Sequence, residues 1–207
     1  DCLHYTKPQN YVKFLSENCP YINKAISAFR LDSWGFGFGR VVLKLIFSLK
    51  IMQVQIDQSG KIENTSKNTV LAFANSKSFS VLITAKCKRQ LQDIFRRRGQ
   101  SRIFIYWTFA AGIALLLQDC VKEITEVIID EEYTDKDRLI REILIDTLQK
   151  LDVNKIPEIF FDRIGKKSKA HYIAYGVNLK RTKVGRILSL KVFKELYSVE
   201  SNKDLSA

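Results

Sequence analysis

The spacing of apolar and polar residues predicts three short strands early in the chain. QVQID at 53–57 alternates polar and apolar residues with a period of two, which is typical of a half-buried strand. TVLAFA at 69–74 and FSVLIT at 79–84 are β-rich runs, and the turn composition NSKS between them predicts a hairpin. The polar stretch 58–68 joins the first strand to this hairpin. We therefore expect three strands paired antiparallel through short loops.

Helices begin to appear in the pattern after this hairpin. Apolar residues recur at helical spacing from Cys87 onward, and the run that follows predicts an apolar helix over 103–118. EVIID at 126–130 is a short, nearly continuous apolar run, which is typical of a buried strand. This strand is the fourth in the expected order.

The last third of the chain repeats the alternation of helix and strand. Thr134, with Asp137 three residues later, forms a capping-box-like start for a helix. EIFFD at 158–162 is the fifth expected strand, and two further helical stretches are expected over about 168–179 and 189–198.

This order of elements predicts the fold class. The first three strands can pair antiparallel, whereas the last two need helical crossovers and are therefore expected to be parallel. The expected fold is α/β, with a mixed five-stranded sheet (a three-strand antiparallel meander, then two parallel strands) and helices on both faces.

The first 51 residues differ from the rest, because they show no clear alternation and no capping signals. Two explanations are open. Residues 1–51 are an N-terminal extension, or they are upstream sequence read in frame before a true start at Met52. A complete fold can be read from Met52 onward, which favours the second explanation. We therefore expect one domain over 52–207.

Basic residues are in excess and are unevenly distributed. The chain has 34 Lys and Arg against 22 Asp and Glu. Seven basic residues and one acid lie in 86–102, and eight basic residues and no acid lie in 163–186. Thirteen acids and six basic residues lie between them, in 119–162. An acidic centre between basic flanks favours a metal site beside a surface that holds phosphates, and so favours nucleic acid as a partner. Ordinary helix surfaces produce the same pattern.

Cysteine spacing and hydropathy limit the other classes. The four cysteines form no C-x-x-C pair, so we expect reduced thiols and a cytoplasmic protein. They are Cys2, Cys19, Cys87 and Cys120. The longest apolar run, 103–117, is shorter than the roughly 20 residues that cross a bilayer, so we expect a core helix and no membrane partner.

Two strand ends carry acids that could form a metal site. Asp57 ends the first strand, and Asp130 ends the fourth and is followed by Glu131 and Glu132. Ligands gather beyond the carboxyl ends of parallel strands, and clustered carboxylates favour Mg²⁺ or Mn²⁺. Glu132 is the favoured third ligand, because a period of two places it on the same face as Asp130. The structural alternative is a turn at Asp57 and a solvated strand end at Asp130.

Other residues are weaker candidates. Asp93 and Asp119 are acids expected on helices. His171 is either a structural histidine or a group that orients a carboxylate and transfers a proton. Tyr172 and Tyr175 could stack on bases, but we expect both to face the core. The candidate phosphate-binding residues are Arg97, Lys166 and Lys167.

The expected strand order, with Asp57 on the first strand and Asp130 on the fourth, resembles the ribonuclease H-like superfamily over about 52–180. In that fold these two strands are neighbours, and each carries a catalytic aspartate. IDQSG at 56–60 is similar to the I-D-E-S-G opening of an uncharacterised prokaryotic family of presumed nucleases. Gln58 stands where that family has Glu, and His171 falls where it places a late aspartate.

The resemblance implies a divalent-metal-dependent nuclease that hydrolyses nucleic acid phosphodiesters. Asp57, Asp130 and Glu132 would bind Mg²⁺ or Mn²⁺, and His171 would complete the catalytic group. The alternative is a non-catalytic nucleic-acid-binding or assembly protein on the same fold.

Overall fold

The computed structural model describes residues 52–75 and 77–203 of the chain, with side chains described as far as residue 197. The expected extension 1–51, with Cys2 and Cys19, lies outside the described residues. Its relation to the rest of the chain therefore stays a prediction.

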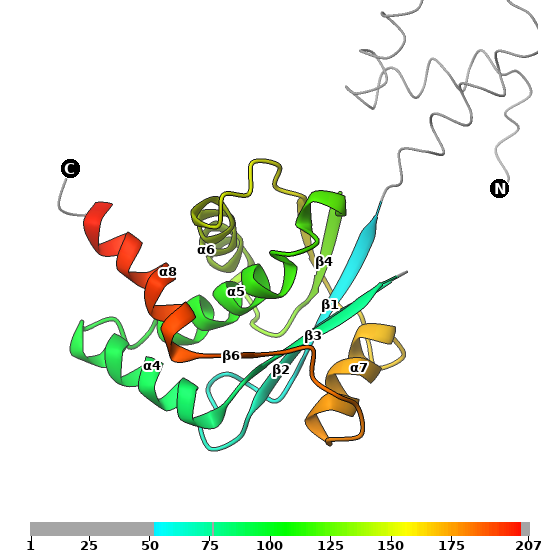
Figure 1. The fold of residues 1–207 in the computed structure, drawn as a ribbon, viewed down its shortest axis with the longest axis horizontal. Helices are drawn as coiled ribbons and strands as arrows, with labels where there is room; N and C mark the ends of the chain where they lie inside the picture. The colour runs from blue at the N-terminus through cyan, green and yellow to red at the C-terminus, as the bar shows by residue number, and fades with distance from the viewer. Residues whose placement is uncertain (1–51, 76, 204–207) are drawn as a thin grey trace, which may run out of the picture. The chain divides into compact units, whose positions relative to one another are not determined.

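A mixed six-stranded sheet forms the centre of the described part, in the order β5-β4-β1-β2-β3-β6. β1, β2 and β3 pair antiparallel, whereas β4 is parallel to β1, β5 to β4, and β6 to β3 (Figure 1). The strand bounds are Gln53–Ser59 (β1), Thr69–Ala74 (β2), Ser78–Ile83 (β3), Glu126–Asp130 (β4), Glu158–Asp162 (β5) and Arg186–Leu188 (β6). The α/β class, the antiparallel meander and the two parallel strands that follow are confirmed.

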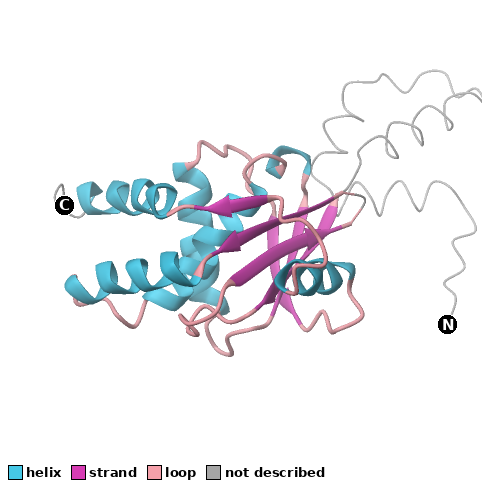
Figure 2. Ribbon diagram, turned by 60° about the horizontal axis from the view of Figure 1, so that its bottom comes forward, coloured by secondary structure: helices cyan, strands magenta, loops and turns pink. Residues whose placement is uncertain are grey.

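Helices lie on both faces of the sheet, as expected (Figure 2). On one face, α5 packs on β2 and β3, α4 and α6 pack against α5, and α8 contacts α4 and α6. On the opposite face, α7 packs against β1, β2 and β3. The helix bounds are Ala85–Arg97 (α4), Phe104–Leu117 (α5), Asp137–Lys150 (α6), Lys169–Asn178 (α7) and Leu190–Lys203 (α8), and a short 3₁₀ turn spans Val121–Glu123.

The apolar run that forms α5 is a core helix, as its composition predicts. Nearly all of its side chains are buried. A Cβ added to Gly112 would lie 2.7 Å from Leu71 Cδ1, so the glycine lets α5 approach the sheet closely. Within 52–75 and 77–203, none of the helices combines the length and the hydropathy that a membrane crossing requires.

The sixth strand corrects the expected count of five. β6 has only three residues and pairs with the outer side of β3. A Cβ on Gly185 would lie 2.6 Å from the Phe79 ring, so this glycine permits the close approach of the two strands. A three-residue strand is too short to show a period, which is why the pattern does not reveal it.

The start of α6 also differs from expectation, because the capping role of Thr134 is wrong. Lys136 occupies the N-cap, and no side chain caps the helix. The Lys136 N–H donates to the Tyr133 carbonyl, and Asp135 has a φ of 62°, so the chain turns before the helix begins. Asp137 instead lies in the first turn, where a carboxylate interacts favourably with the helix dipole.

Candidate metal centre

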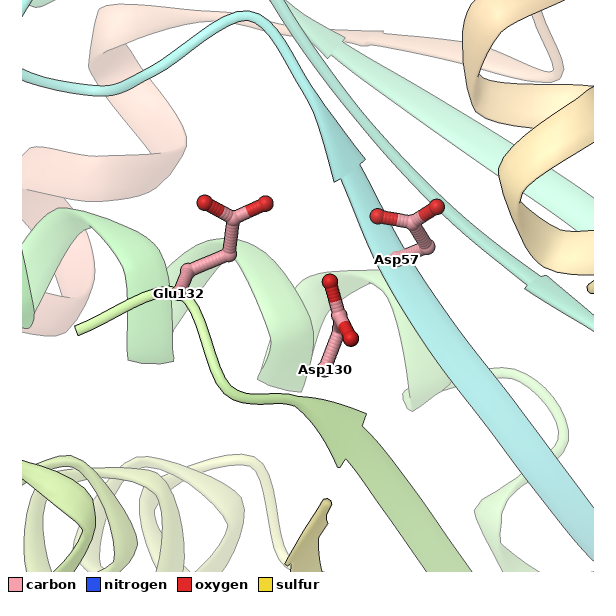
Figure 3. A group of neighbouring side chains, drawn as sticks. All are labelled: Asp57, Asp130 and Glu132. Atoms are coloured by element: carbon pink, nitrogen blue, oxygen red, sulfur yellow. The ribbon is translucent and has the colours of Figure 1, made fainter. Parts of the chain in front are cut away.

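Three carboxylates come together where β1 and β4 end (Figure 3). Asp57, Asp130 and Glu132 each offer an oxygen that lies within 4.8 Å of the others. In the parallel pairing of β1 with β4, Ile56 lies opposite Ile129, so the next residues, Asp57 and Asp130, are also neighbours. The expected meeting of these acids at two adjacent strand ends therefore appears in the fold.

Asp57 points to the α7 side of the sheet. Val54 and Ile56 are buried on the α5 side, and the alternation of the strand places Asp57 on the other face. Its Oδ2 lies 2.7 Å from His171 Nδ1, and its Oδ1 accepts a hydrogen bond from the Gln58 backbone N–H. Asp57 is therefore a buried carboxylate held from two sides.

His171 is placed for this contact by the start of α7. Ser168 is the N-cap of the helix, and its Oγ accepts a hydrogen bond from the His171 backbone N–H at 3.0 Å. The imidazole of His171 then forms a hydrogen bond with Asp57, which lies 114 positions earlier in the sequence. His171 therefore lies beside the acids, and its role in proton transfer stays a prediction.

Electrostatics in the group disfavour negative charge. Burial is the main cause that raises the pKa of Asp57, and Asp130 adds to it, while the hydrogen bonds from His171 and Gln58 oppose it. Burial also raises the pKa of Glu132, followed by repulsion from Asp130 and Asp57. Carboxylates placed this way repel each other, and a divalent cation between them would relieve that cost.

The donor set fits a hard cation. All three ligand atoms are carboxylate oxygens, which Mg²⁺ and Mn²⁺ prefer. In the part of the chain that the structure describes, the two cysteines, Cys87 and Cys120, are free thiols, and neither belongs to the carboxylate group. The arrangement can therefore hold a metal ion bound through oxygen.

Two neighbours of the site were not expected from the sequence. Lys61 and Glu63, on the loop after β1, both act on the pKa of Glu132, Lys61 lowering it and Glu63 raising it. Tyr133 donates its hydroxyl to Glu63 Oε2 at 3.2 Å. In the sequence, this loop is only a polar stretch between two strands. Its pattern therefore does not predict that it lies near the carboxylate group.

Lys88, in the basic run 86–102, anchors the same loop. Its side chain is fully buried. Nζ donates at 2.8 Å to the carbonyls of Lys61 and Asn64 and to Thr69 Oγ1. Burial lowers the pKa of Lys88 to about 8. This lysine acts on the shape of the loop and is not available to bind a phosphate.

The three candidate phosphate-binding residues do not lie on one element. Lys166 and Lys167 are exposed on the loop between β5 and α7, on the α7 side of the sheet. Arg97 is exposed at the end of α4, in the helix layer that packs around α5 (Figure 1). Only the two lysines adjoin the helix that carries His171.

Asp93 and Asp119 do not join the carboxylate group. Asp93 pairs with Arg96 at 3.7 Å on α4. Asp119 pairs with Arg186 at 3.3 Å, linking the end of α5 to β6. Both acids form surface ion pairs, which makes them suitable controls for substitutions in the group.

The expected burial of Tyr172 and Tyr175 is wrong. Tyr172 is 63% exposed and Tyr175 is 47% exposed. Ala170, Ala174 and Val177 form the buried side of α7 instead, and the two alanines let the helix lie close to the sheet.

The carboxylate group and the residues around it are the features of this chain that bear on function. Neither a family model nor a curated protein nor a solved structure was found to match the chain.

Proposed function

We propose that the protein is a divalent-metal-dependent nuclease that hydrolyses nucleic acid phosphodiesters. The convergence of Asp57, Asp130 and Glu132 at the carboxyl ends of two adjacent parallel strands carries the proposal. One of these acids is buried and the other two are half-buried, and their mutual repulsion reduces stability unless a cation binds between them.

The carboxylates of Asp57, Asp130 and Glu132 hold Mg²⁺ or Mn²⁺ in this proposal. The bound metal supplies activation of water and stabilisation of the leaving oxygen. His171 is oriented by the bond between its Nδ1 and Asp57. Its other nitrogen, Nε2, is then the atom that exchanges a proton with the reacting groups.

A ribonuclease H-like fold is part of the proposal. It is supported by the antiparallel meander of β1, β2 and β3, and by the position of β4 beside β1 with an aspartate at the end of each. The helix that follows β5 places His171, which stands where the similar family has a late aspartate, against Asp57 of the first strand. The edge strand β6 is an addition to the expected five strands.

One observation favours the alternative, a non-catalytic nucleic-acid-binding or assembly protein on the same fold. His171 already bonds one of the two carboxylate oxygens of Asp57, Oδ2, and so competes with a cation for the charge of this side chain. If the bond to His171 excludes the metal, the basic surface binds nucleic acid without cutting it.

Cleavage assays distinguish the two functions. The full chain is incubated with single-stranded and duplex RNA and DNA, with Mg²⁺, with Mn²⁺ or with a chelator. We expect metal-dependent cleavage that falls at least about 100-fold in Asp57→Asn, since even the partners of metal ligands contribute 10- to 100-fold. Asp93→Asn is the matched control and is expected to cleave normally. Binding without cleavage in any metal would favour the alternative.

A further inference from the structure

The outer face of α7 carries large apolar side chains that nothing in the described residues covers. Tyr172, Tyr175 and Leu179 follow one another at spacings of three and four, so they form one stripe along the helix. Tyr172 and Tyr175 are among the most exposed large apolar side chains of the described residues, and Leu179 is also exposed. A grouped exposed apolar surface of this kind indicates a binding partner.

This stripe lies beside the carboxylate group. His171 bonds Asp57, and Asn178 Nδ2 donates to Ser59 Oγ at 3.0 Å, so one side of α7 follows β1. Tyr175 lies on this side between them, with its ring nearly parallel to that of His171. Tyr172 meets the His171 ring edge to face. The aromatic surface therefore begins at the side chain that contacts the proposed metal ligand.

Basic residues border the stripe at both ends of α7. No acid occurs in 163–186. The exposed basic residues are Lys166, Lys167 and Lys169 at the start of the helix, and Lys180, Arg181 and Lys183 after its end. A cavity of about 360 Å³, lined in part by Lys167, Ser168 and Lys169, lies between the helix start and the first residues of β1. This charge matches a polyanion that runs along the helix.

We propose that this face of α7 binds single-stranded nucleic acid, with bases stacked on Tyr172 and Tyr175 and phosphates held by the flanking lysines. Aromatic faces accept any unpaired base, and basic side chains follow the backbone. A duplex keeps its bases stacked inside the helix and cannot offer them to these rings. This inference rests on the proposed nuclease function, in which the adjacent carboxylates act on nucleic acid. It specifies that the nucleic acid is single-stranded.

Binding measurements in a chelator test the inference separately from cleavage. The full chain is titrated into a fluorescent oligothymidylate of about 20 nucleotides, and into a duplex of the same length. The variants are Tyr172→Ala/Tyr175→Ala, its matched control Tyr172→Phe/Tyr175→Phe, which keeps the rings, and Lys166→Gln/Lys167→Gln. Thermal unfolding establishes that each variant is folded.

We expect the wild type to bind the single strand more tightly than the duplex. The Ala variant loses affinity by about tenfold or more, and the Phe variant keeps it, because each stacked base contributes through the ring face. In the Lys variant, the slope of log binding constant against log salt concentration becomes shallower by about 1.4. This is about 0.7 for each of the two lost phosphate contacts.

Equal affinity of the Ala and Phe variants, or equal affinity for duplex and single strand, would overturn the inference. If metal-dependent cleavage persists in that case, the proposed function stands without it. If the rings matter for binding but no metal supports cleavage, the binding surface stands and the nuclease proposal fails.

Discussion

Asp57 combines burial, a neighbouring carboxylate and a histidine partner in one side chain. Its oxygens already receive hydrogen bonds from His171 and Gln58, which lower the cost of its charge, while burial and Asp130 increase that cost. That Asp57 and Asp130 lie close together can be predicted from two acids at the ends of strands. The environment of Lys88 cannot, since a lysine in a basic run has the same pattern whether it is exposed or buried.

Replacing Glu132 by Gln is expected to stabilise the metal-free protein at pH 7 by about 1 kcal/mol, the usual scale for relieving a strained functional site. Burial and two neighbouring acids raise the pKa of Glu132 above its ordinary 4.5. The folded wild type therefore holds this proton more tightly than the unfolded chain, and it loses stability as pH rises through the raised pKa. The advantage of the variant should disappear at acid pH, where Glu132 is protonated.

Urea unfolding of the wild type and of Glu132→Gln across pH 4 to 8 in chelator measures this difference. Glu142→Gln, an exposed acid on α6, is the control. A Gln variant that is less stable than the wild type at pH 7 would show that Glu132 carries a favourable charge.

Replacing Lys88 by Met is expected to destabilise the protein by about 1–3 kcal/mol, because the carbonyls of Lys61 and Asn64 lose their donor. The pKa of Lys88 is lowered to about 8, so between about 8 and the ordinary 10.5 the unfolded chain binds more protons than the folded one. The deficit of the variant relative to the wild type should therefore widen as pH rises through this range.

Hydrogen exchange of residues 60–68, together with unfolding at pH 7.5 and pH 9.5, tests the role of Lys88. Faster exchange in this loop is expected in the variant. Arg89→Met is a neighbouring control, since Arg89 donates only one hydrogen bond to the loop, to the Thr65 carbonyl. A deficit that narrows as pH rises would contradict the account.

At the scale of elements, strands with a clear period and helices with a clear apolar face were predictable. The bounds of β2, β4 and β5 match the expected runs residue for residue. β6 was not predictable, because pairing with β3 stabilises three residues that have no period of their own. The orientation of α7 was not predictable either, because two alanines and a valine form its buried side while Tyr172 and Tyr175 are exposed.

Two helix caps provide a matched test at this scale. Ser168 caps α7 by accepting a hydrogen bond from the backbone N–H of His171. Thr84 caps α4 by accepting one from the backbone N–H of Cys87. Ser168→Ala and Thr84→Ala are each expected to cost about 1 kcal/mol of stability. Only Ser168→Ala should reduce metal-dependent cleavage, since only that cap positions His171. Equal effects of both variants on cleavage, after correction for stability, would contradict a positioning role for Ser168.

At the scale of the whole molecule, the sheet brings together residues that are far apart in the chain. The carboxylate group draws on β1 and on the end of β4, and α7 adds a histidine 114 positions from Asp57. The basic flanks separate in the fold, because Arg97 lies in the α5 layer whereas Lys166 and Lys167 adjoin α7. The net charge of +12 favours the polyanionic partner that we propose, but charge alone does not say which face of the sheet would bind it.

The most direct test is a calorimetric titration of Mn²⁺ into the full chain, with thermal unfolding followed in parallel. It compares the wild type, Asp57→Asn/Asp130→Asn, and the control Asp93→Asn/Asp119→Asn, which removes two acids outside the group. If these carboxylates form a metal centre, Mn²⁺ binds the wild type and the control saturably and raises their unfolding temperature, because a ligand that binds only the folded state stabilises it. Both effects are lost in the first variant. Equal binding heats in all three proteins, or none in the wild type, would contradict a metal centre at these carboxylates.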